Sequence, residues 1–246
     1  MLRLVKVKDS DAYLTLLTGE LGLVEVYAKR LRTRTSKLWP KCQLFSFGDF
    51  ILFENKGRYS LDDVDVVYAF QTLREDLFTL TAASQIAEML IDQTHEPDEA
   101  ELFYPLFIRY CYAVDQGKKD PLWLTYLSQM KIMDEAGYQP RLLGCAVCGK
   151  NPSPVEPLYF DYNYGSILCD RDAKKGQEHY RSDIGPISYD LYRVLSYVEQ
   201  SPVDKLFLVE GKDDWIAEFG FFIRHYLEVR LDKSYDKFEA FRDFGF

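Results

Sequence analysis

The sequence predicts an α+β protein in which a small β-barrel comes first and an all-α domain with a cysteine-containing insert follows. Short segments rich in Val, Leu, Phe and Tyr fill the first seventy residues, and apolar residues recur at helical spacing from Leu73 onward. Two pairs of potential metal ligands then lie between residues 145 and 172. These patterns divide the 246 residues into four expected segments, 1–72, 73–140, 141–182 and 183–246.

The barrel is predicted from five strand-like segments separated by turn residues. Val64, Val66, Tyr68 and Phe70 recur at every second position, as in a half-buried strand. Five or six strands in about seventy residues leave no room for a long helix, so a small closed barrel fits best. The OB-fold is the commonest such barrel, and an SH3-like barrel is the alternative. We expect the strands at 2–7, 13–17, 23–28, 45–53 and 64–70.

A basic segment, 29–41, separates the third and fourth expected strands. It contains six Lys/Arg residues, hydroxyl residues and Trp39, without an apolar period. Residues 1–41 carry nine bases and four acids, a net charge of +5, whereas the remainder carries 21 bases and 35 acids, a net charge of −14. Such asymmetry indicates a mobile loop that contacts nucleic-acid phosphates, with Trp39, or Tyr27 or Tyr13, stacking on bases. The alternative is a solvated basic loop with Trp39 folded into the barrel.

The helical part is predicted from apolar residues at three- and four-residue spacing. A first helix spans about 74–92, a second carries a doubled apolar stripe and stops at Gly117, and a third runs from Pro121 to Gly137. Further helices begin at Ser188 and at Asp213 or Asp214, both suitable N-caps. The tail 235–246 is expected to pack back onto the helices, because it carries phenylalanines at three-residue spacing, namely Phe238, Phe241 and Phe244.

Two ligand pairs have the spacing of a zinc knuckle. Cys145 and Cys148 form the first pair, Cys169 and Asp172 the second, and each pair encloses two residues. Tetrahedral Zn²⁺ accepts thiolates and carboxylate oxygens, so a site of three cysteines and one aspartate is chemically allowed. Gly149 suits the positive φ of the knuckle turn. A knuckle held by packing alone, and His179 as the fourth ligand in place of Asp172, are the alternatives.

Motifs of catalysis are missing from the sequence. No phosphate-binding glycine loop, HExxH or GxSxG occurs, and His95, His179 and His225 are far apart. We therefore expect a protein that is not an enzyme. An odd number of cysteines, three of them in a ligand-like cluster, favours a reducing compartment. Without a secretory segment or an apolar run long enough for a membrane, the chain is expected in the cytoplasm.

The order of these features resembles the RecO family of bacterial recombination and DNA-repair proteins. The resemblance extends over most of the chain, and it depends on the collinear order of short strings, none of which is specific alone. The strings are DAYLTLLT at 11–18, VYAKR at 26–30, GRYSL at 57–61, LREDL at 73–77 and LLGCAVCG at 142–149. Asp172 departs from the family pattern, which has a fourth cysteine, and the first strand begins almost at Met1, so the opening edge of the barrel is expected to be less complete.

The resemblance implies an N-terminal OB-fold and a C-terminal helical domain with a zinc-finger-like insert. It implies a recombination mediator without turnover that binds single- and double-stranded DNA, anneals strands and helps RecA onto DNA coated with single-strand-binding protein. RecR and the acidic tail of the single-strand-binding protein are the implied partners, and Zn²⁺ the implied metal at Cys145, Cys148, Cys169 and Asp172. By position, the implied phosphate contacts are Lys29, Arg30, Arg32, Arg34 and Lys37.

A second hypothesis is a protein-interaction adaptor with a vestigial OB barrel. The acidic body and the many aromatic residues support it. Reversing the charges of Arg32 and Arg34 separates the two hypotheses, because only the mediator then loses DNA binding while it keeps partner binding.

Overall fold

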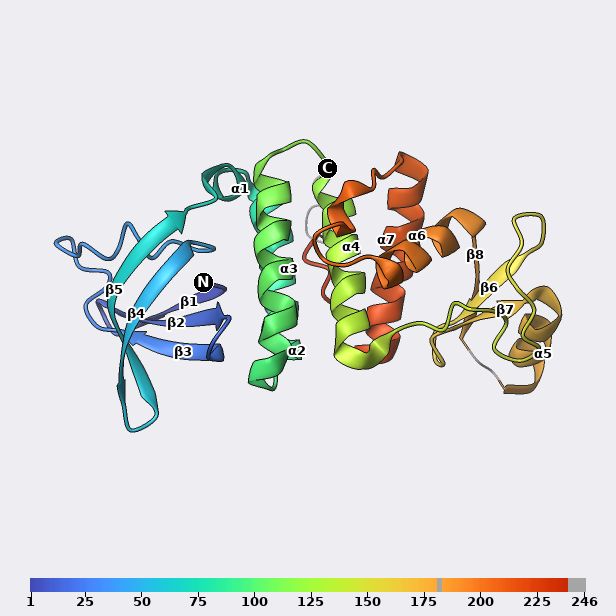
Figure 1. Ribbon diagram of the computed structural model, residues 1–246, viewed down its shortest axis with the longest axis horizontal. Coiled ribbons are helices and arrows are strands. Elements are labelled where there is room, and N and C mark those ends of the chain that lie inside the picture. Colours follow the sequence, from blue (N-terminus) through green and yellow to red (C-terminus); the bar gives the residue numbers. More distant parts are fainter. Residues whose placement is uncertain (181–182, 239–246) are drawn as a thin grey trace. The chain divides into compact units, whose positions relative to one another are not determined.

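The computed structural model describes residues 1–180 and 183–238, with the side chains of 177–180 left out of the description. The chain forms two compact units, Met1–Pro121 and Leu122–Phe246 (Figure 1). Strands precede helices, which confirms the α+β class. The three helices that the sequence groups at 73–140 are shared between the units, because the division falls at Pro121.

The first unit contains a five-stranded sheet. Its order is β1-β2-β3-β5-β4, with β3 and β5 parallel and the other neighbours antiparallel. β5 is a single long strand, whereas the sequence predicts a strand only from residue 64. The strands are β1 (Arg3–Val7), β2 (Asp11–Thr18), β3 (Gly22–Ala28), β4 (Phe47–Asn55) and β5 (Arg58–Tyr68).

The expected closed barrel is wrong in one respect, because the sheet is open between β1 and β4. These two strands are its edges, and no ladder joins them among the described residues. All five residues of β1 pair with β2, from Arg3 opposite Thr15 onward. Met1, which precedes β1, is hydrogen-bonded to the segment that precedes β4: its amine donates to the Ser46 carbonyl at 3.0 Å and its carbonyl accepts from the Phe45 N–H at 3.0 Å. β1 therefore pairs along one edge only, whereas a closed barrel requires every strand to pair along both edges.

The core of the first unit lies on one face of this sheet. Inward residues of β2, Ala12, Leu14 and Leu16, pack with Val26 of β3 and Val64 of β5, all almost fully buried. Because successive strand residues point to opposite faces, the intervening residues of β2 face the other side. Leu31 of the basic segment and Cys42, which follows the segment, are also buried in this core.

Three helices complete the first unit: α1 (Gln71–Glu75), α2 (Leu77–Gln93) and α3 (Pro97–Asp115). The Asp76 side chain caps α2 by accepting from the Thr79 N–H at 2.8 Å, and Glu96 and Glu99 form a capping box on α3. Asp115 at the end of α3 accepts from the Leu73 N–H at 2.8 Å and from the Tyr68 hydroxyl at 3.0 Å. These bonds tie α3 to the end of β5.

The second unit combines helices with a small sheet. β6 (Leu158–Asp161) lies between β7 (Ser166–Cys169) and β8 (Ile184–Ile187), and β8 is a strand that the sequence did not indicate. Phe160 of this sheet contacts Phe222 and Tyr226, with ring centroids 4.9 and 5.5 Å apart. The helices are α4 (Pro121–Met133), a π-turn (Asp134–Tyr138), α5 (Asp170–Tyr180), α6 (Tyr189–Gln200), a 3-10 turn (Leu206–Leu208) and α7 (Asp213–Leu231).

Predicted helix ends agree in part with the structure. Ser188 caps α6, as predicted, by accepting from the Leu191 N–H at 2.9 Å. The prediction for α7 is wrong, because Lys212 occupies the N-cap without a side-chain bond and both aspartates lie in the first turn, where they still favour the helix dipole. Phe238 is buried, whereas Phe241 and Phe244 lie outside the described residues. In the described part of the chain, no helix combines the length and apolarity needed to cross a membrane.

Candidate nucleic-acid interface and candidate metal centre

The basic segment 29–41 is anchored to the sheet where it leaves β3. Asp11 accepts a hydrogen bond from the Arg30 N–H at 2.7 Å and another from the Tyr27 hydroxyl. The Ser10 carbonyl accepts from the Arg32 N–H at 2.8 Å. Arg30 has a φ of 53°, so the chain turns sharply there. The Tyr27 hydroxyl, followed by the Arg30 N–H, holds the pKa of the Asp11 carboxyl below its usual value.

Further along the segment, buried apolar residues alternate with exposed cations. Leu31 is 1% exposed, and Leu38 packs against the same core. Backbone bonds from Ser36 to Thr33 and from Cys42 to Leu38 close turns along the segment. The sequence shows no apolar period here, so these anchors could not be predicted from it.

The cations of the segment point away from the core. Lys29, Arg30, Arg34 and Lys37 are exposed and Arg32 is half-buried. Among the residues that the structure describes, none of these five makes an ion pair with a carboxylate. Lys41 differs, because its Nζ lies 2.9 Å from Asp63. Trp39 is 37% exposed and is not part of the core cluster.

Two tyrosines lie on the outer face of the sheet beside this segment. Tyr13 and Tyr27 are paired across β2 and β3, with ring centroids 5.3 Å apart. Tyr13 is 37% exposed, and the hydroxyl of Tyr27 bonds to the same carboxylate that holds Arg30. Exposed aromatic rings beside unpaired cations are the combination that single-stranded nucleic acids bind.

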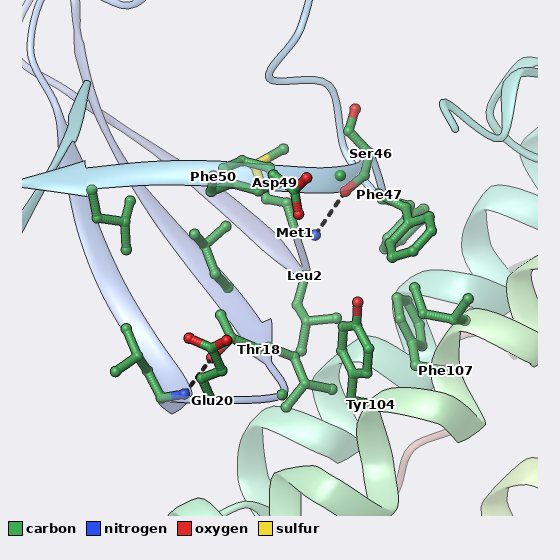
Figure 2. Close-up of a pocket in the computed structure, with 18 residues that line it drawn as sticks. Met1, Leu2, Thr18, Glu20, Ser46, Phe47, Asp49, Phe50, Tyr104 and Phe107 are labelled. Atoms are coloured by element: carbon green, nitrogen blue, oxygen red, sulfur yellow. Dashed lines mark hydrogen bonds between the residues drawn. The ribbon is translucent and has the colours of Figure 1, made fainter. Parts of the chain in front are cut away.

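A cleft of about 370 Å³ in the first unit differs from the basic segment, because its charged side chains are acidic. Apolar groups of the sheet and α3 line it, including Leu16, Phe50 and Phe107, and its charged side chains are those of Glu20 and Asp49 (Figure 2). Carboxylates repel phosphates, so this cleft does not suit a nucleic-acid backbone.

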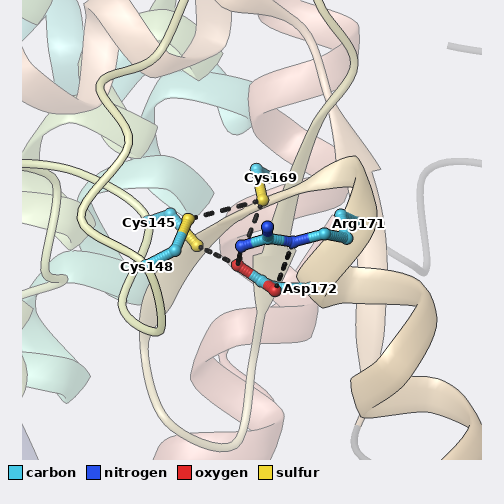
Figure 3. A network of polar contacts seen from close by, with 5 residues as sticks. All are labelled: Cys145, Cys148, Cys169, Arg171 and Asp172. Carbon is cyan, nitrogen blue, oxygen red and sulfur yellow. Dashed lines mark hydrogen bonds and ion pairs between the residues drawn. The ribbon is translucent and has the colours of Figure 1, made fainter.

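The four predicted metal ligands form a cluster in the second unit (Figure 3). Their ligand atoms all lie within 4.8 Å of one another. The sulfurs of Cys148 and Cys169 are 3.8 Å apart, and Asp172 Oδ2 lies 3.3 Å from the Cys145 sulfur and 3.2 Å from the Cys169 sulfur. Zn–S bonds of about 2.3 Å in a tetrahedron place sulfurs about 3.8 Å apart, so the donor set fits this ion. The side chain of His179 lies outside the described part of the chain.

Local backbone structure brings these ligands together. Cys145 and Cys148 lie on a tight turn in which the Cys145 carbonyl accepts from the Gly149 N–H at 2.8 Å. Gly149 has a φ of 72°, which confirms the predicted positive value. Cys169 ends β7, and Asp172 lies in the first turn of α5. The two pairs therefore meet between a knuckle and a strand–helix junction.

The electrostatics of the cluster differ from one ligand to the next. Burial opposes ionisation of Cys145, but the N–H groups of Cys169, Cys148 and Val147 outweigh it and lower the pKa of this thiol. Burial raises the pKa of Cys169 to about 11. The backbone N–H of Asp172 opposes that rise, and the Asp172 carboxylate adds to it. The pKa of Asp172 is lowered, first by Arg171, whose Nε donates to Oδ1 at 3.1 Å and whose Nη2 donates to Oδ2 at 3.3 Å. Sequence reasoning missed Arg171, although its adjacency to Asp172 was visible.

An OB-type strand order with a basic loop, followed by a helical unit with a zinc-finger-like insert, defines a class of two-unit α+β proteins. Family models assign the chain within this class. Residues 1–70 match the model for the N-terminal part of recombination protein O, and residues 74–237 match the model for its C-terminal part. The chain belongs to the RecO family.

Curated relatives agree with this assignment over nearly the whole chain. The DNA repair protein RecO of Acetivibrio thermocellus is 25% identical over 96% of this chain and 91% of its own length. RecO of Clostridium novyi is 28% identical over 94% and 85%, and RecO of Listeria monocytogenes serotype 4a is 25% identical over 98% and 88%. DNA repair is therefore the process to which the family points.

Proposed function

We propose that this protein is a DNA-binding recombination mediator that works without catalytic turnover. It binds single- and double-stranded DNA through the basic segment, anneals complementary strands, and helps RecA onto DNA coated with single-strand-binding protein. Membership of the RecO family supports this proposal. With DNA as its partner, the protein acts in the cytoplasm at the nucleoid.

The observation that carries the proposal is the lack of ion pairs, among the described residues, at five cations of the basic segment: Lys29, Arg30, Arg32, Arg34 and Lys37. They lie on one anchored segment without carboxylate partners among the described residues, in a protein of net charge −9. Each cation that contacts a phosphate releases about one counterion, which supplies affinity without sequence preference. Tyr13 and Trp39 are exposed beside them and offer faces on which bases stack.

We also propose that Zn²⁺ is held by Cys145, Cys148, Cys169 and Asp172. A bound structural zinc would supply cross-linking between the knuckle and the β7–α5 junction. Metal binding of this kind is coupled to folding and contributes on the order of 10 kcal/mol in small zinc domains. The zinc would stabilise the insert, and no catalytic step is assigned to it.

Partner proteins are the next part of the proposal. RecR and the acidic tail of the single-strand-binding protein are proposed to bind outside the basic segment. Exposed apolar side chains around the knuckle support a protein-binding role, because Leu143, Val147 and Val155 are 94%, 71% and 87% exposed. The same observation favours the second candidate function, a protein-interaction adaptor whose sheet does not bind DNA.

The test compares DNA affinity among matched variants by fluorescence anisotropy with labelled single-stranded DNA. Arg32→Glu/Arg34→Glu reverses two charges on the basic segment, and Arg109→Glu/Lys118→Glu reverses two exposed charges elsewhere in the same unit. A mediator loses most of its affinity in the first variant and little in the second, while partner binding persists in both. Weak DNA affinity that is the same in all three proteins would favour the adaptor.

A further inference from the structure

Arg171 and Asp172 form a two-point contact at the edge of the cysteine cluster (Figure 3). The guanidinium donates through Nε to Oδ1 and through Nη2 to Oδ2, so it contacts both carboxylate oxygens. The Asp172 side chain is 3% exposed, whereas that of Arg171 is 66% exposed. Oδ2 is also the atom nearest to the sulfurs of Cys145 and Cys169. Arg171 therefore fixes the orientation in which the carboxylate faces the cluster.

The position of Arg171 is unusual for a cation. It is the second residue of α5, where the partial positive charge of the helix N-terminus disfavours a guanidinium. The neighbouring cations have other partners, since Lys150 Nζ lies 2.5 Å from Glu156 and Lys174 Nζ lies 2.8 Å from Asp170. Arg171 instead pairs with a member of the cluster. A role in the cluster explains why a cation is placed there.

Charge in the cluster gives the physical reason. Three thiolates and one carboxylate around a divalent cation leave a net charge of −2, and the adjacent guanidinium reduces it to −1. A carboxylate is also a harder ligand than thiolate, so it depends more on being held in place. Groups that hydrogen-bond to metal ligands orient them, and losing one typically weakens metal affinity by about 10- to 100-fold.

We propose that Arg171 is a positioning residue that enables Asp172 to serve as the fourth zinc ligand. This inference rests on the proposed metal site. The planar guanidinium of Arg171 hydrogen-bonds to both carboxylate oxygens of Asp172, turns Oδ2 toward the sulfurs and offsets the excess negative charge of the cluster. Lysine lacks that planar group, so Arg171→Lys keeps the charge but not the orientation. A thiolate in place of Asp172 needs no such clamp, so the dependence on Arg171 disappears in an Asp172→Cys background.

The experiment measures zinc affinity by chelator competition and zinc content by mass spectrometry in the full-length protein. The variants are Arg171→Met, Arg171→Lys, Asp172→Cys, and Asp172→Cys combined with Arg171→Met. Lys174→Met is the matched control, because it removes one charge from the same helix. Co²⁺ substitution adds a spectroscopic readout, since its visible absorption reports tetrahedral coordination by thiolates. Circular dichroism establishes that each variant is folded.

We expect Arg171→Met to bind zinc about 10- to 100-fold more weakly than the wild type, and Arg171→Lys to recover only part of that loss. Lys174→Met should bind as the wild type does, and Arg171→Met should have little effect in the Asp172→Cys background. Equal zinc affinity and equal Co²⁺ spectra in the wild type and Arg171→Met would overturn the role of Arg171 and leave the proposed metal site in place. A wild type that takes up no zinc would overturn the metal site as well, without bearing on DNA binding.

Discussion

The carboxylate of Asp11 accepts the backbone N–H of Arg30 at 2.7 Å. One acidic residue at the start of β2 thus sets the position at which the basic segment leaves β3. The same carboxylate accepts a hydrogen bond from the hydroxyl of Tyr27, whose ring lies tilted against that of Tyr13. One buried acid therefore holds both the start of the basic segment and Tyr27.

The stability contributed by Asp11 should depend on pH. Its pKa is lowered in the folded protein, by the Tyr27 hydroxyl first and the Arg30 N–H second. A carboxyl with a depressed folded pKa stabilises the protein above its unfolded pKa of about 4, and this stability is lost as pH falls through the folded value. In urea unfolding at pH 7, the free energy of unfolding of the wild type should exceed that of Asp11→Asn, and the difference should shrink as the pH falls below about 4. A difference independent of pH would contradict this assignment.

Tyr13 should contribute to single-stranded DNA binding through its ring. Tyr13→Ala is expected to weaken single-stranded DNA binding by about 1–3 kcal/mol, the usual value of one aromatic–base stack, and double-stranded DNA binding by much less. Tyr13→Phe keeps the ring and should bind as the wild type does. Anisotropy titrations with both DNA forms measure these differences. Loss of affinity in Tyr13→Phe equal to that in Tyr13→Ala would argue against stacking.

Removing zinc should destabilise the second unit and leave DNA binding by the first unit nearly unchanged. The four ligands lie within residues 145–172, whereas the basic segment belongs to the unit Met1–Pro121. Treatment with a chelator should lower the thermal midpoint, and zinc should restore it. Asp172→Ala should resemble the chelated wild type. If chelation abolished DNA affinity, the metal region would take part in DNA binding.

Local patterns in the sequence predicted the local structure well. The spacing of Ala83, Ala87 and Leu90 indicated the first long helix, and Ser188 marked the start of α6, because periodicity and capping act within a few residues. The single helix expected from about residue 74 is divided at Asp76 into α1 and α2. Strand positions followed from segments rich in Val, Leu, Phe and Tyr, although β5 begins at Arg58 and not at residue 64. The cysteine cluster was also predictable, since the spacing within each ligand pair is set by the reach of one metal ion.

Relationships between distant residues could not be predicted in this way. The open edge of the sheet depends on whether β1 can pair with β4 as well as with β2. The start of the first strand next to Met1 indicated a less complete edge, but not that the sheet stays open there. The bond from Arg30 to Asp11 spans 19 residues, so nothing near Arg30 reveals its anchor. β8 became a strand because β6 offers it a free edge. The role of Arg171 depends on a side-chain orientation that sequence adjacency does not determine.

The salt dependence of DNA affinity tests the central claim most directly. Affinity for labelled single-stranded DNA is measured at several salt concentrations for the wild type, Arg32→Ala/Arg34→Ala and the matched control Arg109→Ala/Lys118→Ala. Five phosphate contacts predict a slope of about −3.5 in a plot of log affinity against log salt, and removing two contacts predicts about −2. That result, with an unchanged control, would assign the DNA site to the basic segment. A weak slope that is the same in all three proteins would contradict it.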